Sequence, residues 1–273
     1  MNSRDMQVIG LCRFSYPALG GFQVEHETVE EREAFLYDPA RMDERFRIFE
    51  ALTLPPLRAQ TDSDFIFGVV IGTSFPAPLR ARLEGLLADI PQAVIITRPP
   101  GRHRSVMKEV INDLREDRDT PSLQFRMDDD DAVSVRFVER LREVAQDLRG
   151  VIRNNRYTGI DFNQGFIARV DAKGLRAKPC VETLWTPALA IAVSPHASRG
   201  IMNFSHAKLS RIMPVLSVTG EDMFIRGHND FNDSRQKDGI RPVRLPRISS
   251  EDAEHFKRVF NIEEAQVRAV HAS

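Results

Sequence analysis

The sequence has few cysteines, almost no net charge and no long apolar segment. Cys12 and Cys180 are the only cysteines among 273 residues, too few to staple a chain of this length, and they fit a reducing compartment. Lys and Arg total 38 against 39 Asp and Glu, a formal charge of −1, which argues against a dedicated nucleic-acid-binding protein. No apolar run approaches the roughly 20 residues that cross a bilayer.

Two familiar nucleotide-binding motifs are missing as well. No segment matches the phosphate loop GxxxxGK[ST] or the dinucleotide fingerprint GxGxxG, and neither internal repeats nor low-complexity segments occur. The N-terminal apolar stretch is short and is broken by Arg13, unlike a secretory signal. Hydrophobic residues make up 42% of the chain, enough to bury a core. We therefore expect a globular, cytoplasmic protein.

Short apolar segments in the first half predict β-strands. Val8–Cys12, Phe65–Ile71 and Ala93–Thr97 are nearly continuous apolar runs, and such runs are typical of strands covered on both faces. In Leu123–Met127 apolar residues alternate with Gln124 and Arg126, which predicts a fourth strand with one wetter face.

Apolar residues spaced three and four apart predict helices between these strands. Such stripes cover residues 79–90, 106–114 and 137–148, and a further helix over about 45–58 is expected to end at Pro55 and Pro56. Strands alternating with helices indicate an α/β fold, with a mainly parallel (mixed) sheet flanked by helices.

Two regions depart from this alternation. Residues 16–44 form an acidic insertion, interpreted either as a lid or as a solvated surface excursion. After Gly150 the pattern becomes irregular. Residues 159–170 and 188–193 predict strands or hairpins, residues 204–212 a short helix, and residues 249–260 a helix capped by Ser249 or Ser250. The first half thus suits a nucleotide-type site and the second a variable partner site.

Four consecutive aspartates, Asp128–Asp131, follow the predicted fourth strand. The carboxyl ends of strands are where open α/β sheets bind ligands. In extended backbone, Asp128 and Asp130 point to the same side. Their mutual repulsion is relieved by a hard divalent cation such as Mg²⁺ or Mn²⁺. The alternative is that Asp131 caps a helix over 132–148 while its neighbours face water.

Four stretches of the chain are informative together: Arg13–Tyr16, Leu54–Asp62 with Asp64-Phe65, Arg126–Ala132 and Ile225–Asp230. In these stretches the sequence resembles the putative rhamnosyltransferase family, which is similar to the GT-A glycosyltransferases. The resemblance implies a GT-A-like fold, in which residues 1–150 form the nucleotide-sugar-binding half. Residues 151–273 then form an irregular acceptor-side half and C-terminal extension, within one continuous domain.

The resemblance also implies roles for individual residues. Asp128 and Asp130 take the places of the Asp-x-Asp motif, which holds a divalent metal against the donor diphosphate. His228 is a candidate third metal ligand or else a solvated loop histidine. The candidate donor contacts are Arg13, Arg98, Asp129 and Arg226. Each of these arginines has an alternative role, at the surface for Arg226 and in pairing with the acidic insertion for Arg13 and Arg98.

Transfer to a hydroxyl group by inversion requires a carboxylate that accepts the hydroxyl proton. The candidates in the second half are Glu182 and Asp222, with Asp161 and Glu221 as further options. Trp185 is interpreted as a core residue or as a platform for a sugar. His206 is interpreted as a buried, hydrogen-bonded histidine or as a residue that orients the acceptor.

Together these features predict a metal-dependent glycosyltransferase that moves a sugar, rhamnose if the family name holds, from a nucleotide-sugar donor to a hydroxyl acceptor. The acceptor is expected to be a saccharide or a glycolipid. The alternatives are a metal-dependent phosphohydrolase or nucleotidyltransferase, and a non-catalytic sugar- or nucleotide-binding module. Basic residues near the C-terminus either contact the inner face of a membrane or only keep the tail soluble: Arg235, Lys237, Arg241, Arg244 and Arg247.

Overall fold

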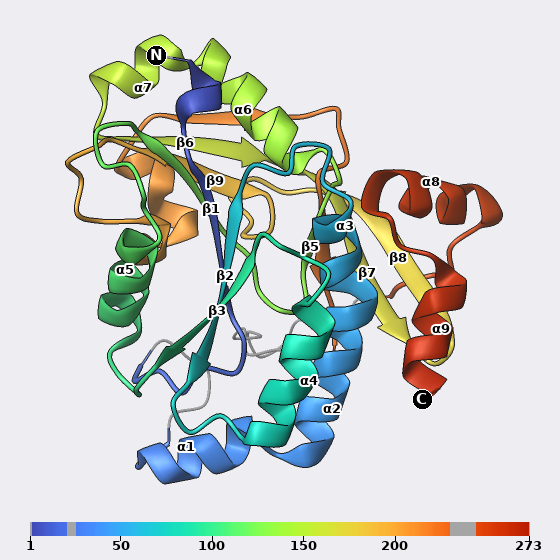
Figure 1. Cartoon of the computed structure of the whole chain (residues 1–273). Coiled ribbons are helices and arrows are strands. Elements are labelled where there is room, and N and C mark those ends of the chain that lie inside the picture. The colour runs from blue at the N-terminus through green and yellow to red at the C-terminus, as the bar shows by residue number, and fades with distance from the viewer. Residues whose placement is uncertain (1, 21–25, 230–243, 273) are drawn as a thin grey trace.

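The computed structural model describes residues 2–20, 26–229 and 244–272. Within them a seven-stranded sheet forms the centre of the molecule and a four-stranded sheet lies beside it (Figure 1). The larger sheet consists of β1 (Val8–Arg13), β2 (Ile66–Gly72), β3 (Ala93–Arg98), β4 (Ser122–Arg126), β6 (Tyr157–Phe162), β9 (Leu189–Val193) and β10 (Val215–Val218). The smaller sheet consists of β5 (Ala132–Val133), β7 (Gln164–Asp171), β8 (Gly174–Val181) and β11 (Phe224–Gly227).

The strands of the larger sheet run in the order β10-β6-β9-β4-β1-β2-β3. β1 to β4 are parallel to one another, whereas β9 is antiparallel to both of its neighbours. Gly10 in β1 makes room for its neighbour strand, because a Cβ there would lie 2.3 Å from Cζ of Phe125. The four predicted strands and the mixed, mainly parallel sheet are thus confirmed.

Helices cover both faces of this sheet. The helices of the described residues are α1 (Val29–Leu36), α2 (Pro39–Ile48), α3 (Leu54–Arg58), α4 (Ala77–Leu87), α5 (His103–Asp113), α6 (Phe137–Asp147), α7 (Arg149–Asn154), α8 (Ser250–Phe260) and α9 (Glu264–Ala272). Of these, α8 and α9 pack on the smaller sheet instead. The side chains of β1 alternate between the two faces, as the period of a strand requires. Val8 and Cys12 pack with α2, α4 and α6, and Ile9 and Leu11 pack with α5 on the opposite face (Figure 1).

The prediction that Pro55 and Pro56 end a helix is wrong. α2 continues into a π-helical turn, Phe49–Thr53, and then into α3, whose first turn contains both prolines. The first turn of a helix tolerates proline because its N–H groups need no partner within the helix. The change of helix type before the prolines therefore lets the chain stay helical.

Two further predictions near the aspartates are wrong. The helix expected from residue 132 begins at Phe137, because Ala132 and Val133 form β5 and pair with β11. Asp131 therefore caps no helix. The face of β4 expected to be wetter is buried: Gln124 is 0% exposed, and its side chain bonds with Ser122 and with the N–H of Ile201. Polar residues in a strand need not face water when partners are supplied locally.

The second half of the chain contributes three strands, β6, β9 and β10, to the same large sheet. Residues 204–212, predicted as a helix, contain only a 3₁₀-helix, His206–Arg211. The tail helix is confirmed as α8. Its cap is Ser249, whose hydroxyl accepts from the N–H of Asp252, and α8 packs on the smaller sheet.

The structure describes parts of the acidic insertion and of the basic segment near the C-terminus. The acidic insertion contains α1 and the start of α2, with Thr28 capping α1. Among the basic residues near the C-terminus, Arg235, Lys237 and Arg241 lie outside the described residues. Across the described ranges, every helix is too short or too polar to cross a bilayer.

Candidate active site

The four aspartates lie at the carboxyl end of β4, beside the carboxyl end of β1. The register of the two strands places Leu11 opposite Arg126, so Arg13 comes next to the aspartate run. The run then leads into β5, which pairs with β11. Residues from both ends of the chain thus meet at this edge of the large sheet.

Asp129 is turned away from its neighbours and into the protein. Its side chain is 1% exposed and receives a hydrogen bond from Nε of Arg45 at 2.8 Å, with a second contact from Nη2. Arg45 belongs to α2, and Thr53 Oγ1 donates to the backbone carbonyl of Asp129 at 3.0 Å. The sequence predicts that Asp129 contacts the donor. In the structure its carboxylate instead binds Arg45 of α2, which fixes the aspartate run to the rest of the protein.

The other three aspartates converge. Asp128, Asp130 and Asp131, hereafter the aspartate cluster, each offer an oxygen within 4.8 Å of the others. Asp131 accepts from the N–H of Gly227 at 2.9 Å and from Arg226 at 3.4 Å. Three carboxylate oxygens at such spacing match the ligands that a hard divalent cation prefers. Asp131 had been expected to turn toward a helix.

Two more contacts complete the surroundings of this cluster. Asn229 Nδ2 donates to Asp130 at 2.7 Å, and Arg13 lies 3.7 Å from Asp128. The backbone comes very close here: a Cβ on Gly227 would lie 1.8 Å from the carbonyl oxygen of Asp130. Only glycine fits at that position in this arrangement.

The pKa values in the cluster diverge for identifiable reasons. Burial, together with the neighbouring carboxylates of Asp129 and Asp128, raises the pKa of Asp130 to about 6. Burial also raises the pKa of Asp131 well above its usual value. Burial acts upward on Asp128 too, but Arg13 and Arg226 outweigh it and lower the pKa of that carboxyl. A bound divalent cation favours the charged form of all three groups, so the donor set fits such an ion.

His228 directly follows β11, and its backbone N–H donates to the carbonyl of Ala168 at 2.8 Å. In the described part of the chain, the side chains close enough to share an ion are those of the aspartate cluster. The ring of His228 is not among them. Asp131 thus joins Asp128 and Asp130 in the geometry, and a metal contact by His228 stays a prediction.

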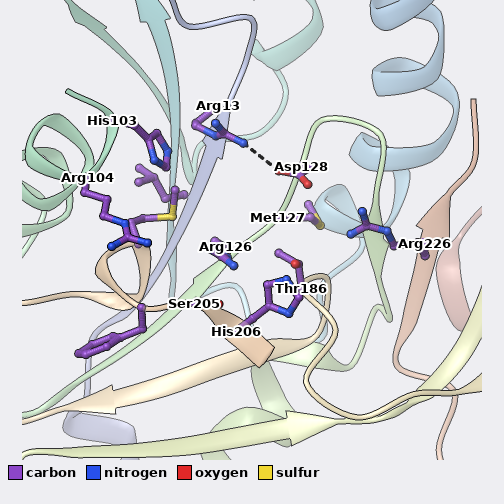
Figure 2. A pocket seen from close by; sticks show the side chains of 13 residues that line it. Arg13, His103, Arg104, Arg126, Met127, Asp128, Thr186, Ser205, His206 and Arg226 are labelled. Atoms are coloured by element: carbon purple, nitrogen blue, oxygen red, sulfur yellow. Dashed lines mark ion pairs between the residues drawn. The ribbon is translucent and has the colours of Figure 1, made fainter. Parts of the chain in front are cut away.

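A cavity of about 290 Å³ opens beside Asp128 (Figure 2). Its titratable lining consists of Arg13, Arg104, Arg126, Arg226, His103, His206 and Asp128. Of the expected donor contacts, Arg13 and Arg226 lie in this lining. Arg98 does not, because it pairs with Asp113 at 2.8 Å outside the cavity.

Sequence reasoning missed three residues of the cavity: Arg126, His103 and Arg104. Arg126 is the last residue of β4, and His103 and Arg104 form the first turn of α5. A signal for the second pair was present, since helix starts favour acidic residues and this one has basic residues instead. Burial and the arginines Arg13 and Arg126 lower the pKa of His103 to about 3, so its ring is neutral.

The candidate proton acceptors lie elsewhere. Glu182 is exposed just after β8, and Asp222 is bound by Gln164 at 3.0 Å and by His255 at 2.8 Å. Asp161 is 0% exposed and accepts from Ser217 at 2.7 Å. None of these carboxylates lines the cavity.

Glu221, the remaining candidate carboxylate, pairs with Arg140 at 2.7 Å.

Trp185 packs against the main hydrophobic core, and the guanidinium of Arg226 lies 6.0 Å from the centre of its ring. The tryptophan therefore lies beside the cavity, next to Thr186, which lines it.

His206 lines the cavity and has a defined tautomer. Its Nδ1 lies 2.7 Å from the carbonyl oxygen of Leu184, and a carbonyl only accepts, so Nδ1 carries the proton. Nε2 is left as an acceptor. Burial, with Arg126 nearby, lowers the pKa of His206, which keeps the ring neutral at pH 7.

A family model described as "Putative rhamnosyl transferase" matches residues 7–241. No curated protein matches the chain. Similar solved structures include S. aureus TarS 1–349, with 8% identity and a TM-score of 0.41, over 81% of this chain and 60% of that one. The same protein with UDP-GlcNAc gives 11% identity and a TM-score of 0.44, over 98% and 71%. A Bacillus anthracis protein titled "Putative Glucose-1-Phosphate Thymidylyltransferase", in complex with a sucrose, gives 9% identity and a TM-score of 0.40, over 80% and 88%.

Proposed function

The chain belongs to the family described as "Putative rhamnosyl transferase", whose model matches residues 7–241, and we propose that it transfers a sugar from a nucleotide-sugar donor to a hydroxyl acceptor. The observation that carries this proposal is the aspartate cluster at the wall of a cationic cavity. Carboxylates that converge beside arginines suit a cation and a diphosphate together.

We propose that Asp128, Asp130 and Asp131 hold Mn²⁺ or Mg²⁺. Their oxygens lie close enough to share one ion. Burial, and after it the carboxylates of Asp129 and Asp128, raises the pKa of Asp130 to about 6, and a bound cation would oppose both effects. When bound, the cation supplies Lewis-acid stabilisation of the charge that grows on a departing diphosphate. Metal dependence also follows the GT-A pattern that the sequence resembles.

Arg13 and Arg226 are the proposed diphosphate contacts. Each is already within 4 Å of an aspartate of the cluster, at 3.7 Å from Asp128 and 3.4 Å from Asp131. A diphosphate that meets the cation at this point also meets both guanidinium groups. Arginine suits this role because it stays charged and binds phosphate oxygens in a fork.

His206 is the proposed proton acceptor for the hydroxyl group of the acceptor. Among the described residues that line the cavity, Asp128 is the one carboxylate, and it belongs to the aspartate cluster. Nε2 of His206 offers a lone pair to a bound hydroxyl because Nδ1 donates to Leu184. Glu182 and Asp222 lie outside the cavity, which favours His206 over both.

Thermal unfolding with uridine or thymidine diphosphate, with and without Mn²⁺, tests the donor site. We expect these ligands to raise the melting temperature of the parent only when Mn²⁺ is present. Asp130→Asn should abolish that shift. Asp113→Asn, which removes a surface carboxylate outside the cavity, should preserve it. Unchanged nucleotide binding in Asp130→Asn would remove the metal from the proposal.

The products identify the reaction. Incubation with thymidine-diphosphate rhamnose, the donor that the family description suggests, should release free nucleoside diphosphate if a sugar is transferred. Release of monophosphate or pyrophosphate would instead indicate a phosphohydrolase or nucleotidyltransferase. His206→Gln keeps the size of the side chain and should lower the transfer rate while leaving nucleotide binding in the melting assay intact.

A further inference from the structure

The cavity carries more positive charge than the proposed donor requires. Four arginines line it against the single carboxylate of Asp128, as far as the described residues go. A divalent cation, Arg13 and Arg226 carry four positive charges, against five negative charges on the aspartate cluster and the diphosphate of a nucleotide sugar. Arg104 and Arg126 add two positive charges, so the site as a whole keeps one positive charge in excess.

These two arginines have no partner of their own in the described part of the chain. The side chain of Arg126 makes no hydrogen bond or ion pair there, and its Nε is fully buried without an acceptor. The side chain of Arg104 is likewise without such a contact. A guanidinium whose buried N–H has no partner costs free energy, so the presence of Arg126 in the cavity wall points to a ligand that supplies the acceptor. Arg104 is exposed and is available to the same ligand.

Arg104 lies apart from Asp128 and Arg226. Figure 2 shows Arg104 and His103 on one side of the cavity, Asp128 and Arg226 on the other, and both Arg126 and Arg13 between them. α5 begins at His103, at the side of the cavity where Arg104 lies. No side chain caps its first turn, so the positive end of its dipole adds to the field there. The buried Nε2 of His103 also lacks a partner.

We propose that Arg104 and Arg126 form a subsite for an anionic group, a carboxylate or a phosphate, carried by the acceptor. This inference rests on the proposed function, because it assigns the diphosphate to the end of the cavity where Asp128 and Arg226 lie. It departs from the expected division of the chain, since Arg104 and Arg126 belong to the half that the resemblance assigns to the nucleotide sugar. The subsite selects acidic saccharides or phosphate-bearing acceptors over neutral ones. It also places the hydroxyl of such an acceptor in the same cavity as His206.

The fluorescence of Trp185, the only tryptophan in the chain, provides the assay. Its ring lies beside Arg226 and Thr186 at the cavity wall. The parent protein, loaded with Mn²⁺ and uridine diphosphate, is titrated with glucose, glucuronate and glucose 6-phosphate at constant ionic strength. We expect at least one of the anionic sugars to bind about tenfold more tightly than glucose, and which one does so distinguishes carboxylate from phosphate.

Variants of single arginines show which side chains cause the preference for anionic sugars. Arg104→Gln and Arg126→Gln should each remove most of the preference for the anionic sugar and leave the affinity for uridine diphosphate with Mn²⁺ unchanged. Arg98→Gln, which removes a positive charge outside the cavity, should change neither. Arg104 is exposed at a helix start, so its variant remains informative even if Arg126→Gln fails to fold.

The outcomes separate the two proposals. If the parent does not bind nucleoside diphosphates, the proposed function fails. If it binds them but treats the three sugars alike, only the anionic subsite is overturned. The subsite is equally overturned if Arg104→Gln and Arg126→Gln weaken diphosphate binding as much as sugar binding, or if Arg98→Gln has the same effect as they do.

Discussion

Arginines are buried or half-buried in two regions of this protein, and they have different partners in the two regions. In the scaffold, Arg45 is 7% exposed and binds Asp129 through both Nε and Nη2. Arg142 is 5% exposed and pairs with Asp62 at 2.9 Å and Asp64 at 2.8 Å. In the cavity, Arg126 has no such partner among the described residues.

This difference shows that the scaffold supplies carboxylate partners for its buried arginines, whereas the cavity supplies none for Arg126. A buried charge is tolerated when it is paired and hydrogen-bonded, and the scaffold arginines meet that condition. The aspartate run contains both situations. Asp129 binds Arg45 of α2, whereas the oxygens of its three neighbours converge on one point. Among the described residues, buried side-chain atoms without a hydrogen bond also occur outside the cavity, for example on Arg142. Arg126 differs from Arg142 because its guanidinium has no ion pair either.

Breaking the scaffold pair should have the largest effect. Arg45→Met removes the guanidinium that binds the buried carboxylate of Asp129, so we expect a loss of about 3–5 kcal/mol in the free energy of unfolding, measured by urea denaturation. The double variant Arg45→Met with Asp129→Leu removes both charges and should recover much of that loss. A single variant as stable as the parent would mean that Asp129 finds another partner.

Gly227 tests the contact between β11 and the aspartate run. Gly227→Ala places a methyl group 1.8 Å from the carbonyl oxygen of Asp130, so the backbone must shift, at a cost of about 1–3 kcal/mol. Mn²⁺-dependent nucleotide binding should weaken with it. Gly85→Ala, in α4 with open space around the new Cβ, is the control and should be neutral or stabilising. Equal behaviour of the two variants would contradict the close approach.

The sequence predicts the first half of the fold better than the site. The apolar runs around Ile9, Val69 and Ile95 determine strands locally, because both faces of the sheet are covered. Local signals also place Asp128 and Asp130 at a strand end. Asp129 and Asp131, however, depend on partners far along the chain: Arg45 lies 84 residues away and Gly227 lies 96 residues away. Such distant contacts leave no periodic trace in the sequence.

The same reason explains the missed cavity residues. Arg126 reads as one more polar residue of an alternating strand, and only the packing of the second half turns it into the wall of a cavity with His206. His103 and Arg104 were detectable as unusual residues for a helix start. The break at Pro55 was mispredicted because a π-helical turn has no recognisable sequence signal.

The pH dependence of the unfolding free energy tests how positive the cavity is, because His103 lies among its arginines. Its pKa in the folded state is about 3, whereas it is near 6.5 when unfolded. Between these values the unfolded chain binds more protons, so stability is complete above pH 6.5 and falls as the pH drops toward 3. His103→Gln should lose less stability between pH 7.5 and pH 5, by up to about 1.4 kcal/mol per pH unit below 6.5.

His196→Gln, at an exposed position, is the control for that measurement and should follow the parent at every pH. Comparing parent and variant cancels the contribution of the carboxylates that titrate in the same range. Identical pH profiles for His103→Gln and the parent would mean that His103 binds its proton over the same pH range in the folded and the unfolded state. The field of the cavity would then be less positive than its arginines indicate.

The smallest effect, and the most telling, is expected at Arg126. Burial and the neighbouring arginines lower the pKa of its guanidinium to about 10, which means that the charged form is poorly accommodated in the folded protein. Arg126→Met should therefore raise the unfolding free energy by about 1 kcal/mol, or the melting temperature by about 2 °C. Arg45→Met, the same substitution in the scaffold, should act in the opposite direction. If both variants are destabilised alike, Arg126 is a structural residue, and its charge is not held in place for a ligand.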